Sequence, residues 1–281
     1  MERAHIIFDI DKCVGCFNCM LACQDEHLGN DWLPYTASQP LHGKKWIKTT
    51  RHERGKAPII DVVFKTEMCH HCENAACEKR FPDAIEHRED GIVLIKPDKA
   101  GNKELVDACP YGMIAWNEEK GVAQKCTMCA HLLDDGWKEP RCVNACPLRA
   151  LKYVKCSDEE YEGMIIKKKL RRAGNEAHKS RLAYKNMYRI TSVYVHGAVV
   201  YITEGGYERV IEGAKARLLL NGQEIASQET NFFGEYRIDS LPKNAGDFVL
   251  EISAPGYRTV TKNVTVTDVC CDAGKVTLEK D

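Results

Sequence analysis

The chain has 281 residues, a formal net charge of −1 at pH 7 and a hydrophobic content of 44%. This length accommodates about two domains, the composition is that of a globular chain, and the balanced charge argues against nucleic acid as the main partner. Apolar runs such as residues 92–95 and 218–220 are far too short to span a membrane, and residues 1–5 lack the apolar core of a signal peptide, so we expect a soluble, cytoplasmic protein.

Fifteen cysteines are the unusual part of the composition, and twelve of them precede residue 147. A secreted, disulfide-bonded protein is one alternative, but the chain is long, the cysteine count is odd and no export signal is visible. Cysteines two residues apart in a reducing compartment are usually metal ligands. The pattern therefore favours metal binding.

The first cysteine group follows a short apolar segment, residues 6–8, which we expect to be a strand. Its cysteines are Cys13, Cys16, Cys19 and Cys23. Three closely spaced thiolates on a tight loop hold three corners of one iron–sulfur cube, and the fourth cysteine of such a run ligates the other cluster of a pair. Zinc sites more often use two separate CxxC loops.

Residues 24–68 contain no cysteine but several aromatic and basic side chains, among them Trp32, Trp46, Arg51 and Arg54. We interpret this stretch as an insertion. A surface for a partner and a lid over a cluster are both open interpretations.

The second cysteine group is incomplete. Cys69, Cys72 and Cys77 supply three ligands, but Phe81 occupies the position of the fourth, just before a proline. His70 and His71 lie inside this group. Histidine ligates Rieske centres, but we expect these two to flank a cluster and tune it.

Cys109 has the opposite deficiency. It precedes Pro110, as the last cysteine of a ferredoxin run does, yet residues 98–108 contain no cysteine. If the two incomplete groups exchange last ligands, Cys109 completes the quartet of Cys69, and another quartet has lost all its ligands together. In the alternative, Cys109 is a structural thiol and the Cys69 group holds a [3Fe–4S] cluster.

The last full group is Cys126, Cys129, Cys142 and Cys146, followed by Pro147. Alone it would also suit a zinc ribbon. Beside the first group it reads as a ferredoxin run with an insertion, and the two groups then exchange their last cysteines.

The sequence thus predicts three [4Fe–4S] clusters on twelve cysteines. The predicted ligand sets are Cys13, Cys16, Cys19 and Cys146; Cys126, Cys129, Cys142 and Cys23; and Cys69, Cys72, Cys77 and Cys109. We expect Cys156, Cys270 and Cys271 to be free thiols, with a vicinal disulfide between the last two as a less favoured alternative.

After the cysteine-rich region of residues 1–156, Ser157 and Glu160 form a capping-box pattern that predicts a helix from about residue 158 to about Gly174. We expect residues 157–192 to be a helical linker. It carries a basic run at residues 167–172, which is usually only a solvated helix face.

From about residue 193 the apolar residues alternate with period two. Ala214, Ala216, Leu218 and Leu220 share one face before a tight Asn221-Gly222 turn. Phe248, Leu250 and Ile252 alternate in the same way. Residues 193–281 therefore predict a small antiparallel β-sandwich, and the fold class is α+β: tandem ferredoxin-like modules followed by an all-β domain. No catalytic motif occurs in the chain.

The two modules with complementary gaps resemble the iron–sulfur subunits of the molybdopterin oxidoreductase (DMSO-reductase) superfamily, which usually carry four quartets. Within it, the chain resembles the three-cluster small subunits of pyrogallol–phloroglucinol transhydroxylases over essentially its whole length. The segments that carry this resemblance are residues 88–95, 122–135, 184–189 and 229–235. The last domain resembles transthyretin-like or carboxypeptidase-regulatory sandwiches.

The resemblance implies a hetero-oligomer with a large catalytic subunit that carries a molybdenum or tungsten bis-pterin guanine dinucleotide and acts on phenolic rings. This chain would then be a non-catalytic electron-transfer subunit. A catechol dehydroxylase or another molybdenum reductase is an alternative complex. A structural zinc protein with an interaction domain and a stand-alone ferredoxin are alternatives of other classes.

Overall fold

The computed structural model describes residues 1–281, which divide into two compact units. The first comprises residues 1–51 and 63–187, and the second comprises residues 52–62 and 188–281. The expected α+β class is confirmed, because helices and short hairpins gather in the first unit and two sheets form the second. A short piece of the predicted insertion, residues 52–62, belongs to the second unit.

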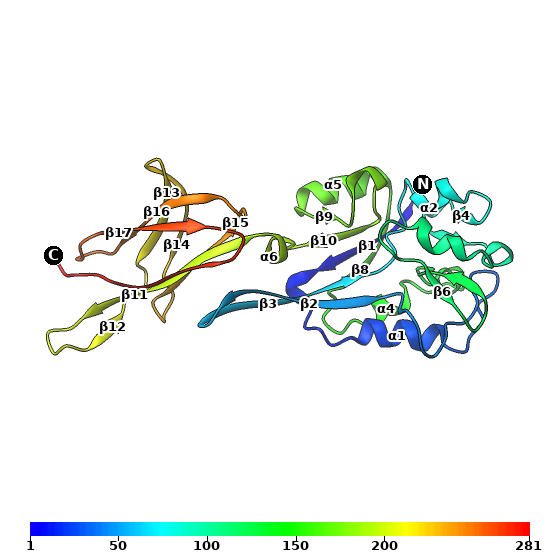
Figure 1. Ribbon diagram of the computed structural model, residues 1–281, viewed down its shortest axis with the longest axis horizontal. Helices are drawn as coiled ribbons and strands as arrows, with labels where there is room; N and C mark the ends of the chain where they lie inside the picture. Colours follow the sequence, from blue (N-terminus) through cyan, green and yellow to red (C-terminus); the bar gives the residue numbers. More distant parts are fainter. The chain divides into compact units, whose positions relative to one another are not determined.

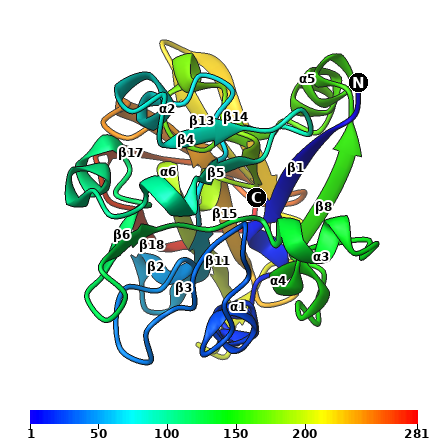
Figure 2. The same cartoon turned by 90° about the vertical axis from the view of Figure 1, so that its right-hand side faces the viewer.

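A four-stranded sheet forms the base of the first unit. Its order is β8 (Leu151–Cys156), β1 (Arg3–Asp9), β10 (Leu182–Lys185) and β9 (Arg171–Arg172). The predicted strand at residues 6–8 lies within β1, which pairs antiparallel with β8 (Figure 2) and parallel with β10. Helix α5 (Asp158–Lys167) contributes Tyr161 to a small apolar core with Ile7 and Ala183 of this sheet.

The rest of the first unit consists of short helices, the hairpins β4–β5 and β6–β7, and the parts of the β2–β3 hairpin outside residues 52–62. Figure 1 labels β2, β3, β4 and β6. The strands are β2 (Lys48–Lys56), β3 (Ile59–Glu67), β4 (Ile85–His87), β5 (Val93–Ile95), β6 (Ala115–Asn117) and β7 (Val122–Gln124). The helices are η1 (Ile10–Lys12), α1 (Asn18–His27), α2 (Ala76–Arg80), η2 (Pro97–Lys99), η3 (Lys103–Ala108), α3 (Ala130–Asp134), α4 (Arg141–Asn144) and η4 (Glu176–His178). No helix of the chain has both the length and the hydropathy that a membrane span requires.

The region of residues 157–192 differs from the expected helical linker. The predicted capping box is present, with Ser157 and Glu160 bonded reciprocally. However, helix α5 ends at Lys167 and not near Gly174, and Lys169 adopts a left-handed conformation with φ +51°. The following residues form β9 and β10 of the sheet in the first unit, where the apolar side chains of Leu182 and Ala183 are buried beside β1.

Two four-stranded sheets make up most of the second unit. One has the order β12 (Glu208–Val210), β11 (Val193–Ile202), β15 (Glu235–Leu241), with β18 (Cys271–Thr277) also paired to β11. The other has the order β14 (Gln223–Glu229), β13 (Lys215–Leu220), β16 (Gly246–Ser253), β17 (Val260–Val266). The short helix α6 (Tyr188–Thr191) precedes β11.

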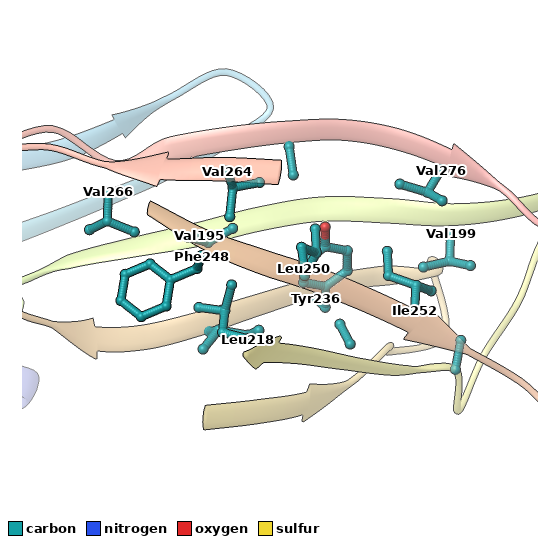
Figure 3. Close-up of a cluster of buried hydrophobic side chains, with 14 of the residues drawn as sticks. Val195, Val199, Leu218, Tyr236, Phe248, Leu250, Ile252, Val264, Val266 and Val276 are labelled. Carbon is teal, nitrogen blue, oxygen red and sulfur yellow. The ribbon is translucent and has the colours of Figure 1, made fainter. Parts of the chain in front are cut away.

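The inward side chains of both sheets share one apolar core, in which Figure 3 shows Leu218, Leu250 and Val195 among the buried residues. The predicted period-two faces are confirmed at Ala214, Ala216 and Leu218, whereas Leu220 is exposed because it borders the Asn221-Gly222 turn. The expected all-antiparallel sandwich needs one correction, since β18 runs parallel to β11. A parallel neighbour leaves no local turn signal in the sequence.

Candidate metal centres

Twelve thiols gather in three cavities of the first unit, four thiols to each. None of the fifteen cysteines forms a disulfide. The three groups are Cys13, Cys16, Cys19 and Cys146; Cys69, Cys72, Cys77 and Cys109; and Cys23, Cys126, Cys129 and Cys142. The structure thus brings together each of the three sets that the spacing predicted, including the crossed positions of Cys23 and Cys146.

The loop of the first group curls because two of its residues adopt left-handed conformations. Gly15 has φ +68° and Phe17 has φ +61°, immediately before α1 begins at Asn18. A Cβ atom on Gly15 would lie 2.5 Å from the ring of Phe64, so glycine is needed here for space as well as for φ. Helix α1 then presents Cys19 to the first cavity and Cys23 to another.

Backbone N–H groups point at two of the clustered sulfurs. The amide of Met128 donates to Sγ of Cys126 at 3.3 Å, and the amide of Ala150 donates to Sγ of Cys146 at 3.2 Å. Hydrogen bonds to sulfur stabilise the thiolate form and are one of the factors that set cluster potentials. Both loops are therefore shaped to hold anionic sulfur.

The middle cavity is built by a loop, a helix and a distant segment. His71, between Cys69 and Cys72, has φ +44°, Cys77 lies in α2, and Cys109 follows η3. An aromatic wall covers this cavity, where His70 lies 4.3 Å from the ring of Tyr111.

The positions of the absent fourth quartet are filled by apolar packing. Leu105, Ala100 and Ala108 are buried in one cluster with Ile85 and Ile95, and Phe81 packs against it. A packed hydrocarbon core therefore occupies the region to which the sequence assigned the lost ligands.

Burial makes the thiols of these groups difficult to ionise. Burial raises the pKa of Cys72 to about 12, and the neighbouring thiols add a smaller contribution in the same direction. Burial also raises the pKa of Cys129 to about 12. Burial also raises the pKa of Cys142 well above its ordinary value. Thiols in such surroundings become thiolates only when a bound metal compensates their charge.

The insertion covers one of the cavities. Trp46 and Ile47, which are buried, line the cavity of Cys23 together with His27. Trp32 stacks on His131 of α3 with ring centroids 4.3 Å apart. Of the two interpretations left open for residues 24–68, this part of the insertion agrees with the lid, because it closes the cavity of one cysteine quartet.

The donor set suits a cube better than a single ion. No three His, Cys, Asp or Glu side chains are arranged to hold one metal ion. A [4Fe–4S] cluster instead takes four separate thiolates, and each cavity offers four thiols within a largely apolar lining. The residues present therefore fit the cluster.

The cysteine spacing did not identify Lys125 as a residue of this region. Lys125 is buried, and its Nζ lies 3.6 Å from Sγ of Cys69. The only sequence signal was its place directly before Cys126, where a lysine would ordinarily be read as a surface residue.

Comparison with known proteins places the chain. Residues 60–156 match the 4Fe-4S dicluster domain family, so fold and site define an iron–sulfur protein that carries [4Fe–4S] clusters. The pyrogallol hydroxytransferase small subunit of Pelobacter acidigallici is 43% identical over 99% of this chain and 100% of its own length. This protein therefore belongs to the family of pyrogallol hydroxytransferase small subunits, and is an electron-transfer subunit.

More distant relatives share part of the chain. One component of the anaerobic dimethyl sulfoxide reductase of Escherichia coli (strain K12) is 36% identical over 52% of this chain and 70% of its own length. A putative dimethyl sulfoxide reductase iron-sulfur subunit of Halobacterium salinarum is 31% identical over 57% of this chain and 69% of its own length. The resemblance to the DMSO-reductase superfamily is thereby confirmed.

Proposed function

We propose that this chain carries three [4Fe–4S] clusters and serves as the electron-transfer subunit of a pyrogallol hydroxytransferase-like complex. Its partner would be a large subunit with a molybdenum or tungsten bis-pterin guanine dinucleotide that acts on phenolic substrates. The observation that carries the proposal is the grouping of twelve thiols into three cavities of four.

Each thiol of a quartet would bind one iron of its cluster. A bound cube exchanges one electron, at a potential set by its charge, its hydrogen bonds and its solvent exposure. The solvent exposure differs between the cavities. Buried Trp46 and Ile47 line the cavity of Cys23 and would exclude water from it. In the cavity of Cys13, by contrast, the ligand Cys16 is itself exposed.

The first cavity is the proposed docking side for the large subunit. Three apolar side chains that line it are exposed to solvent, namely Val14, Phe17 and Leu148. Exposed apolar groups gathered at one site are typical of a protein interface, and an electron can leave this cavity over a short distance only if the acceptor docks here.

Two further assignments are part of the proposal. The sandwich would be of the transthyretin-like or carboxypeptidase-regulatory kind, which is supported by its two packed sheets. The complex would act in the cytoplasm, as we expect from the sequence.

Metal analysis of the anaerobically purified complex tests the cluster count. We expect about twelve irons and about twelve sulfides per chain, with the large subunit co-purifying. The variant Cys109→Ser should lower the iron content by about one third, whereas Cys156→Ser, at a buried thiol outside the three cavities, should leave it unchanged. Colourless protein that holds zinc, or an unchanged iron content in Cys109→Ser, would contradict the proposal.

Docking is tested separately. The variant Leu148→Asp should release the large subunit on gel filtration while it retains iron. The matched variant Leu41→Asp, at an exposed leucine away from the three cavities, should leave the complex intact. Equal retention of the large subunit in both variants would place the interface elsewhere.

A further inference from the structure

Lys125 is a buried cation of the first unit and is 3% exposed. Its Nζ donates to the carbonyl of Cys126 at 3.1 Å, to the carbonyl of Val93, and to Sγ of Cys69 at 3.6 Å. Lys125 therefore adjoins a cysteine of the middle cavity while its own sequence neighbour, Cys126, belongs to another.

No carboxylate in the structure neutralises this ammonium. Its hydrogen-bond partners are two carbonyl oxygens and a sulfur, and none of its contacts is an ion pair with Asp or Glu. A buried charge without a counter-charge is strongly destabilising, and buried lysines are almost always paired. The negative charge that would balance Lys125 is that of thiolate-bound clusters.

His71 bonds to the backbone of the same residue, Val93. The amide of Val93 donates to Nδ1 of His71 at 3.1 Å, while the carbonyl of Val93 accepts from Lys125. Because Nδ1 is an acceptor, the neutral ring carries its proton on Nε2. This Nε2 is buried and has no protein partner.

The position of His71 indicates where acceptors for its free N–H would lie. The residue lines both the cavity of Cys69 and the cavity of Cys23. A buried N–H donor without a partner is costly, and a group that fills either cavity would offer it an acceptor.

This inference rests on the proposed function: we infer that Lys125, as a cation, and His71, as a neutral N–H donor, both bonded to the backbone of Val93, lie between two clusters. Lys125 is the counter-cation of the cluster bound by Cys69, Cys72, Cys77 and Cys109, and His71 donates its Nε2–H to a cluster sulfur. Both are positioning residues that raise the reduction potential of this cluster.

Electrostatics determine whether Lys125 raises or lowers the reduction potential of the cluster. When the cluster accepts one electron from a neighbouring cluster of the same chain, that neighbour loses one electron, and no proton moves. The recipient becomes more negative, so a fixed ammonium beside it stabilises the reduced form more than the oxidised form. Loss of the charge must therefore lower the potential.

Redox titration of the purified complex, followed by electron paramagnetic resonance, tests the inference. The signal of the cluster is identified by its change in Cys109→Ser. In Lys125→Gln, the ratio of reduced to oxidised cluster at a fixed poise should fall at least tenfold, which is about 59 mV for a one-electron couple. Lys125→Arg, which keeps the charge, should stay near the wild type, and so should Lys103→Gln at an exposed lysine.

The outcomes separate the inference from the proposed function. The inference is overturned if Lys125→Gln and the wild type have equal potentials while both keep their iron, and the proposed function then stands. The proposed function is overturned if the wild type shows no [4Fe–4S] signals. Lys125→Gln and the apolar Lys125→Met could both lose this cluster. If Lys125→Arg then retains it, the result supports the inference that the cluster requires a cation at this position. Loss in all three variants shows a packing role instead and contradicts the inference.

Discussion

The guanidinium of Arg54 makes two parallel hydrogen bonds to the carboxylate of Asp239, each 2.8 Å long. Arg54 comes from the end of β2 and Asp239 from β15, so 185 residues separate them in the sequence. The same guanidinium also donates to Asp61 at 2.9 Å. This buried network binds the hairpin tip of residues 52–62 to the sandwich within the second unit.

We expect Arg54→Met to destabilise this unit by about 1–3 kcal/mol, because it removes the two parallel hydrogen bonds to half-buried Asp239 and one of the guanidinium partners of buried Asp61. Hydrogen exchange of the amides of residues 52–62 should accelerate accordingly. The control is Arg237→Ala, since Arg237 is more exposed and lies 3.4 Å from the same Asp239, and we expect it to cost only about 0–1 kcal/mol. Similar exchange in both variants would show that the network contributes little.

The crossed grouping of cysteines predicts which variants share a phenotype. Cys23→Ser should alter the same resonance signal as Cys142→Ser, because both thiols line one cavity. Cys13→Ser should alter a different signal, although Cys13 and Cys23 belong to one sequence motif. A common signal for Cys13→Ser and Cys23→Ser would show that the motif binds a single cluster and would refute the exchange.

A buried histidine away from the cysteines predicts a pH dependence. Burial, reinforced by Arg181, Arg172 and Arg3, lowers the pKa of His5 to about 3. Its ring stacks on Tyr161 with centroids 3.8 Å apart, and Asp158 lies 3.7 Å from Nε2. Between this value and the ordinary pKa of about 6.5, the unfolded state binds more protons than the folded one, so stability falls as the pH decreases through this window.

The variant His5→Phe keeps the stack but removes the proton site. Between about pH 7 and about pH 5 it should lose less stability than the wild type, by on the order of 2 kcal/mol. Anaerobic denaturant titrations at the two pH values measure this difference. His42→Phe, at an exposed histidine, should retain the wild-type dependence, and a parallel pH response of His5→Phe and the wild type would disprove the assignment.

The apolar core at the positions of the lost quartet predicts a stability effect. Leu105 is fully buried there, so Leu105→Ala should destabilise the first unit by about 2–5 kcal/mol through the cavity it leaves. Leu41→Ala, at an exposed leucine, should be nearly neutral. Thermal unfolding measures both, and an unchanged midpoint in Leu105→Ala would mean that this core is loosely packed.

The sequence by itself determined the grouping of the twelve cysteines, the alternation of the sandwich strands and the family. The first two rest on spacing: a tight loop can present only nearby thiols to one point, and a strand sends alternate side chains to one face. For the same reason, the capping box at Ser157 correctly located the start of α5. The family rests instead on the resemblance carried by segments such as residues 229–235.

The tertiary structure alone decided what depends on contacts between distant residues. It placed β10 beside β1, β18 parallel to β11, and Arg54 against Asp239. It also turned Lys125 inward beside Cys69, where spacing indicates an ordinary surface lysine. Such contacts depend on which faces pack together and on which buried charges need partners, and local sequence patterns do not encode either.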